Sequence, residues 1–74
     1  MIKHKTLSEI NNLQTGSYNV GVYSSFGCVA CEGYVEREID NVDYFVDIAQ
    51  EDPNTFSTYS FMPPMIPSII SIDK

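Results

Sequence analysis

The chain has little positive charge and no long apolar run. Only 4 of its 74 residues are Lys or Arg, against 10 Asp or Glu, and the formal net charge is -6. Because no basic patch could neutralise the phosphates of a nucleic acid, a nucleic-acid partner is excluded. No apolar stretch approaches the length of a transmembrane helix or of a secretory leader, which predicts a cytoplasmic protein without a membrane partner.

Side chains that bind metals or perform catalysis are also scarce. The sequence has one histidine, His4, and two cysteines, Cys28 and Cys31, whereas a structural zinc ion takes about four such ligands. We therefore expect no metal site within one chain and no other cofactor. The sequence contains no phosphate-binding loop and no Ser-His-Asp set of a hydrolase. The two cysteines, three positions apart, are the remaining candidates for chemistry.

Short helices and strands are predicted to alternate along a single domain, residues 1–74. Thr6 and Glu9 have the spacing of a capping box, and the run YNVGVYSS is typical of a strand buried on both faces. The expected order is a helix from residue 6, a strand over 18–25, a helix over 31–42, a strand over 43–49, a helix over 53–59 and a strand over 68–72. This alternation predicts an α/β fold with a mostly parallel sheet flanked by helices.

The cysteine pair lies where a buried strand is expected to end and a helix to begin. The free amide groups of a helix N-terminus stabilise a thiolate, which is the attacking species in disulfide exchange. Cys28, at the exposed end of the loop, is then the natural nucleophile, and Cys31, one turn further, is the resolving thiol. A pair of unreactive thiols and a metal shared between two chains stay open as alternatives.

These motifs resemble the thioredoxin superfamily. The segment GVYSSFGCVACEGY is similar to the CxxC motif at a helix start, and MIPSIISI is similar to the triplet of isoleucine, proline and a small residue that opens a later strand. The resemblance implies a thioredoxin-like fold and a thiol–disulfide oxidoreductase, glutaredoxin-like in size, in which Cys28 and Cys31 are catalytic. It implies as partner a protein disulfide, for example in a reductase such as ribonucleotide reductase. A non-catalytic interaction module that uses the same groove is the alternative.

The resemblance also suggests which residues would bind the substrate. On this basis Pro67 is a cis-proline that faces the disulfide, and the backbone of Ile66 pairs with an extended substrate. Phe26 lies in the cysteine loop, so we expect it to be exposed beside the nucleophile and to contact the substrate. Met62 and Met65 flank a Pro-Pro pair, where they would either fill gaps in the packing or form an adaptable apolar lip for a partner.

The sequence departs from the family pattern around the cysteines and at the end of the chain. Val22 occupies the central-strand position of a buried acidic residue, and Val29-Ala30 replaces the usual central dipeptides. Glu32 follows the second cysteine where a basic residue is frequent, and a carboxylate there should oppose thiolate formation. The usual final strand and closing helix do not follow, which indicates either a minimal variant or a fragment. For a minimal variant we expect a second copy or a partner to cover the last strand.

Overall fold

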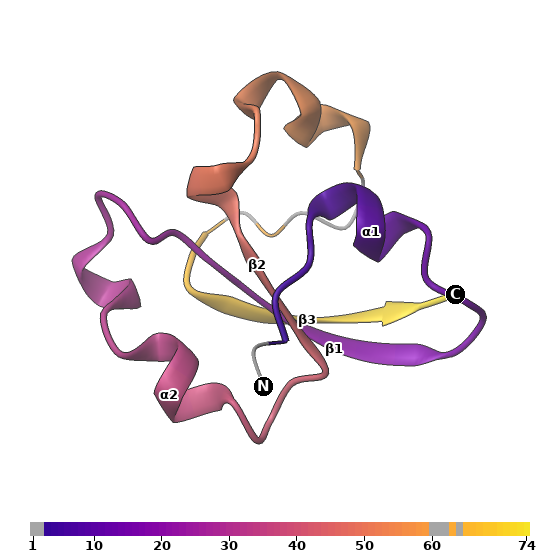
Figure 1. The fold of residues 1–74 in the computed structure, drawn as a ribbon, viewed down its shortest axis with the longest axis horizontal. Helices are drawn as coiled ribbons and strands as arrows, with labels where there is room; N and C mark the ends of the chain where they lie inside the picture. Colours follow the sequence, from indigo (N-terminus) through magenta and orange to yellow (C-terminus); the bar gives the residue numbers. More distant parts are fainter. Residues whose placement is uncertain (1–2, 60–62, 64) are drawn as a thin grey trace.

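The central strand β1 (Ser17–Tyr23) is buried on both faces over four consecutive residues from Val20, as the sequence predicts. The computed structural model describes residues 3–59, 63 and 65–74. In it, β1 lies between β2 (Tyr44–Asp47) and β3 (Ser68–Asp73) (Figure 1). Since both neighbours pair with β1, this strand determines where all the other elements can pack.

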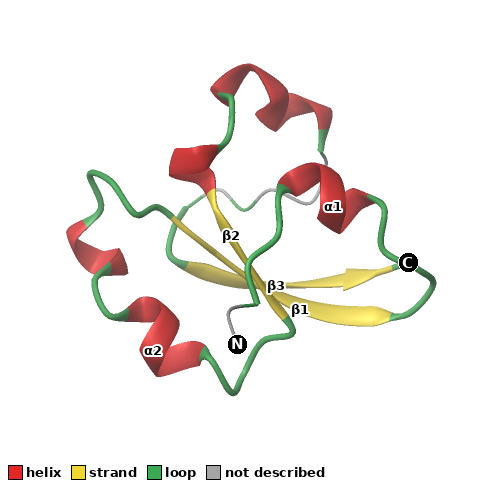
Figure 2. Ribbon diagram, viewed as in Figure 1, coloured by secondary structure: helices red, strands yellow, loops and turns green. Residues whose placement is uncertain are grey.

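The described sheet is mixed, which corrects the prediction of a mostly parallel sheet. β1 pairs parallel with β2 and antiparallel with β3. The reason is the connection after β2, which contains only two 3₁₀ segments, η2 (Ile48–Gln50) and η3 (Pro53–Thr58), among its described residues. Figure 2 shows these turns lying together beyond the end of β2. The chain therefore enters β3 from the edge at which β1 and β2 end.

Helices cover the two faces of the sheet and define two apolar clusters. The α1-side cluster joins α1 (Leu7–Asn11) to the sheet, and its buried members are Leu7, Ile10, Val20, Val22, Val46 and Ile72. The α2-side cluster joins α2 (Tyr34–Glu38) to the opposite face, and its buried members are Tyr23, Cys31, Tyr34, Val42 and Phe45. The second cluster includes a cysteine, so the core packing and the candidate site are continuous.

The start of α1 has the predicted capping box. The hydroxyl of Thr6 accepts the Glu9 N–H at 3.1 Å, and the Glu9 carboxylate accepts the Thr6 N–H at 2.9 Å. These two bonds satisfy amide groups that a helix end otherwise leaves unpaired. They also lower the pKa of the Glu9 carboxyl, the backbone N–H of Thr6 having the largest effect.

Of the helix expected over 31–42, only α2 is helical as predicted: Cys31 ends a preceding 3₁₀ turn, η1 (Val29–Cys31), and residues 39–42 lie beyond the end of α2. Gly33 separates η1 from α2 because it adopts a left-handed conformation with φ of 71°. The apolar residues of the expected helical stripe are nevertheless buried or packed against the α2-side cluster. The sequence period therefore predicted the burial correctly and missed the break.

The N-terminal segment runs beside β2, although its sequence has no strand pattern. Phe45 N–H donates to the Lys3 carbonyl and Lys5 N–H donates to the Phe45 carbonyl, both at 2.9 Å. The Lys3 ammonium donates to the carbonyls of Ile39 and Val42, each at 3.0 Å. Backbone pairing with β2 and the hydrogen bonds from the Lys3 ammonium to carbonyls after α2 together hold this segment.

No helix in the described part of the chain has the length and apolar character needed to cross a membrane.

Gly21 is the position of β1 at which the sheet tolerates no side chain. A Cβ atom built there would lie 3.0 Å from the Phe45 ring and 3.1 Å from the Tyr34 hydroxyl. We expect Gly21→Ala to lower the free energy of unfolding by about 1–3 kcal/mol, because the added methyl overpacks this contact. Urea denaturation measures the loss. The exposed control Ser71→Ala should stay within about 0.5 kcal/mol of the wild type. A Gly21→Ala protein of wild-type stability would contradict the packing described.

Candidate functional site: the Cys28–Cys31 disulfide

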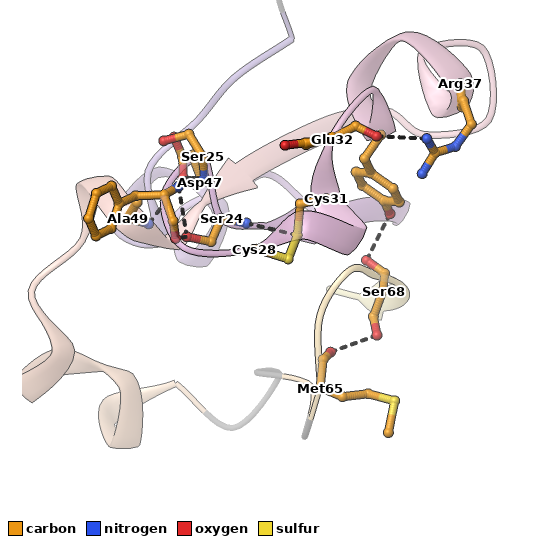
Figure 3. The surroundings of a disulfide bond; sticks show 12 residues. Ser24, Ser25, Cys28, Cys31, Glu32, Arg37, Asp47, Ala49, Met65 and Ser68 are labelled. Atoms are coloured by element: carbon orange, nitrogen blue, oxygen red, sulfur yellow. Dashed lines mark hydrogen bonds between the residues drawn. A yellow bond between two sulfur atoms is a disulfide. The ribbon is translucent and has the colours of Figure 1, made fainter.

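Cys28 and Cys31 form a disulfide just beyond the end of β1, with Cα atoms 5.3 Å apart (Figure 3). Cys28 is the N-cap of η1, and the Cys31 N–H donates to the Cys28 carbonyl at 3.1 Å. Cys31 is only 7 % exposed, whereas Cys28 is half-buried. Of the two sulfurs, the one on Cys28 is therefore the more open to a partner.

The buried sulfur has a backbone hydrogen-bond donor. The N–H of Ser24, the residue after β1, donates to Cys31 Sγ with an N···S distance of 3.5 Å. This contact was not found from the sequence, because it depends on how the cysteine loop folds back over the strand end.

The cysteine loop turns at Ser24 and exposes two apolar side chains. The Ser24 hydroxyl donates to the Phe26 carbonyl at 2.7 Å and accepts the Phe26 N–H at 3.2 Å. Phe26 is 84 % exposed and Val29 is 83 % exposed. The exposure expected for Phe26 is confirmed, and the two side chains stand before and after Cys28 in the chain.

Asp47, at the end of β2, ties down the same loop. Its Oδ1 atom accepts the Ser25 N–H at 2.9 Å and the Ala49 N–H at 3.0 Å. Burial by itself would raise the pKa of this carboxyl, but hydrogen bonds from Ser25, Ala49 and Gln50 outweigh burial and hold the pKa below its usual range. This role was not predicted from the sequence. The available signal was an aspartate in an apolar strand, whose carboxylate can cap the turn that follows.

The segment before β3 packs near the disulfide. The Ile66–Pro67 peptide bond is cis, as the resemblance implies. Ile66 packs against both apolar clusters, and Cys28 packs against the α2-side cluster. Met65 is 70 % exposed, whereas Met62 lies outside the described residues. Figure 3 shows the turn from Met65 to Ser68 lying across from the disulfide, on the side of the Cys28 sulfur.

Two features of the structure give less support to a reactive thiolate at Cys28 than the predicted long helix would give. The helix that follows it is the single 3₁₀ turn η1, so few aligned peptide dipoles point at the sulfur. Val22 is fully buried in β1, so the place at which the resemblance implies an acidic residue is apolar. Glu32 is exposed at the C-cap of η1.

A second polar group, which includes neither cysteine, lies where the N-terminal segment runs beside β2. The ring of His4 is hydrogen-bonded through Nε2 to the Tyr23 hydroxyl and stacks on Phe45, so it is exposed but not isolated. A pocket of about 410 Å³ is open beside it, with Asp47 and Glu51 among its lining residues. Burial raises the pKa of Tyr23, and the charges of Asp47 and Glu36 raise it further. Among the described residues, no cluster of three or more His, Cys, Asp or Glu side chains could hold a metal ion.

Comparison with protein-family models, with curated proteins and with solved structures found no match. The site is therefore defined by its own geometry. It belongs to a small α/β unit with a three-stranded mixed sheet, a CxxC pair joined as a disulfide, and a cis-proline before the third strand. This arrangement is compatible with a thioredoxin-like fold, and the cysteine pair is compatible with redox activity.

The role of Asp47 predicts how acid affects the cysteine loop. Because its folded-state pKa is depressed, the carboxylate stabilises the fold above the ordinary Asp pKa of about 3.9. That contribution is lost as the pH falls through the lower folded-state value. The difference in unfolding free energy between wild type and Asp47→Ala should thus be constant above about pH 5 and shrink below about pH 4.

Amide hydrogen exchange at neutral pH gives a local measure of the same contact. Asp47→Ala should speed exchange at Ser25 and Ala49, the two amides bonded to its carboxylate. The matched control is Asp73→Ala, which removes a carboxylate bonded to the Ser17 hydroxyl at the other end of the sheet. Equal exchange at Ser25 in the two variants would show that Asp47 does not hold the loop.

Proposed function

We propose that the chain is a small thioredoxin-like thiol–disulfide oxidoreductase, which exchanges electrons with protein or glutathione disulfides through Cys28 and Cys31. The observation that carries this proposal is the disulfide between one half-exposed and one buried cysteine, at the end of a buried strand. The neighbouring cis-proline segment and the exposed side chain of Phe26 support it.

The proposed reaction is a two-electron exchange in two steps. The Cys28 thiolate attacks one sulfur of the target disulfide, forming a mixed disulfide and releasing the other target sulfur as a thiolate that takes up a proton. Cys31 then loses its proton to solvent and attacks the Cys28 sulfur. The second target sulfur leaves as a thiol, and the Cys28–Cys31 disulfide forms. A thiol reductant such as glutathione returns the two electrons by the reverse sequence.

The target proposed for this reaction is an extended polypeptide disulfide. Phe26 and Val29 in the cysteine segment and Met65 before the cis-proline are exposed apolar side chains, and the Ile66 backbone beside Pro67 would pair with the target strand. A cytoplasmic reductase, such as ribonucleotide reductase, is the partner that the resemblance implies. β3 lies at an edge of the described sheet, and its coverage by a second copy or another protein stays a prediction.

The competing function is a non-catalytic interaction module that binds partners through the same surface. Two observations favour it: Val22 stands in place of the acidic residue, and η1 is a single turn. Both features remove aids to proton transfer or thiolate formation. The two functions differ in whether the disulfide turns over.

Single cysteine variants test for turnover. Cys31→Ser should accumulate mixed disulfides with a disulfide-bonded peptide, because the intermediate lacks its resolving thiol. Cys28→Ser should neither trap the peptide nor reduce it, since the remaining cysteine is buried. Mass spectrometry identifies the adducts, and a thiol-release assay with dithiothreitol as electron source follows reduction.

The reduced wild type supplies the matched measurement. Its Cys28 should be alkylated faster than Cys31, in keeping with their exposure. If the wild type accelerates peptide reduction no more than an equal amount of Cys28→Ser, the oxidoreductase proposal is wrong and the binding-module function stands. Equal trapping by the two single variants would remove the assignment of Cys28 as nucleophile.

A further inference from the structure

Tyr34 links the cysteine segment to the cis-proline segment. It follows Cys31 by three residues and is 5 % exposed within the α2-side cluster. Its hydroxyl donates to the backbone carbonyl of Ser68, with an O···O distance of 3.1 Å. Ser68 directly follows Pro67, and its own hydroxyl donates to the Met65 carbonyl at 2.7 Å. One hydrogen bond therefore connects the two segments proposed to act on the substrate (Figure 3).

The path of the Tyr34 side chain is fixed by its neighbours. To reach β3 from α2 it crosses β1 at Gly21, where an added Cβ would lie 3.1 Å from the hydroxyl. Gly21 pairs with Ile69, one residue beyond Ser68. The ring also lies against Phe45, edge to face, and against Tyr23, with centroids 6.0 Å away in each case. The absence of a side chain at Gly21 thus opens the path along which the phenol reaches the carbonyl.

The Tyr34 hydroxyl has a defined role as a neutral donor. Burial raises the pKa of this phenol, the charge of Glu38 raises it further, and Arg37 lowers it. A buried phenol without a partner would lose the hydrogen bonds it makes to water in the unfolded chain, at a cost in free energy. The bond to Ser68 satisfies the hydroxyl and at the same time holds the start of β3 against the cysteine segment.

We propose that Tyr34 is a positioning residue, which sets the spacing between the Cys28–Cys31 pair and the Ile66–Pro67 backbone and so favours extended polypeptide disulfides over small ones. This inference rests on the proposed oxidoreductase function and names its substrate class. A small disulfide needs only access to the Cys28 sulfur. A polypeptide must also pair with the backbone before β3, so only its binding depends on this spacing.

The test compares Tyr34→Phe with the matched control Tyr18→Phe. Both variants lose one phenol hydroxyl that donates to a backbone carbonyl, since Tyr18 donates to Gln14 at 3.0 Å, away from the cysteines. The substrates are a disulfide-bonded peptide and 2-hydroxyethyl disulfide. Tyr34→Phe should lower kcat/KM for the peptide by about 5- to 10-fold, mainly through KM, because one hydrogen bond is lost. It should leave the rate with the small disulfide within about twofold, and Tyr18→Phe should change neither.

The other outcomes separate failure of the positioning role from failure of the proposed function. Equal losses on the two substrates, or no loss on either, would overturn the positioning role while the oxidoreductase proposal stands. A wild type inactive on both substrates would instead overturn the proposed function. Amide chemical shifts of Ile66 and Ser68 provide a readout independent of activity, and they should move in Tyr34→Phe but not in Tyr18→Phe. If Tyr34→Phe does not fold, Gly21→Ala, which places a Cβ 3.1 Å from the same hydroxyl, should give the same peptide-selective loss.

Discussion

The fold depends on one constraint, the burial of β1 on both of its faces. A strand with apolar residues on each side needs a cover above and below. The preceding segment supplies α1 for one face, and the following segment supplies α2 for the other. The loop that carries the cysteines lies between the buried end of β1 and the start of α2, so Cys31 is inside the core and Cys28 is at its margin.

The direction of β3 gives the site its second half. A third strand parallel to β1 would begin at the opposite edge of the sheet, far from the cysteines. The antiparallel strand begins at the cysteine edge, so Ser68 lies opposite Val22 and Pro67 comes just before it. The connection after β2 thus both makes β3 antiparallel and brings the cis-proline segment to the edge of the sheet that carries the cysteines. Asp47 contributes at the same edge, because it is the last residue of the strand parallel to β1.

The features predicted correctly from the sequence have local causes. The capping box at Thr6, the buried strand and the position of the cysteines after it follow from residue types at short spacing. The break at Gly33 was missed, since the apolar stripe continues across it without interruption. The antiparallel β3 and the contacts of Tyr34 and Asp47 were also missed. They depend on which distant segments meet, and no periodicity in a single sequence carries that information.

The small separation of the two cysteines has a consequence for the unfolded chain. A disulfide stabilises a protein largely by removing loop entropy from the unfolded state, and the amount grows with the number of residues enclosed. Cys28 and Cys31 are only three positions apart. On the loop-entropy relation their bond contributes about 2 kcal/mol, roughly half of what a bridge between the far ends of β1 and β3 would contribute. Reduction of this pair therefore removes less loop-entropy stabilisation than reduction of such a long-range bridge would remove.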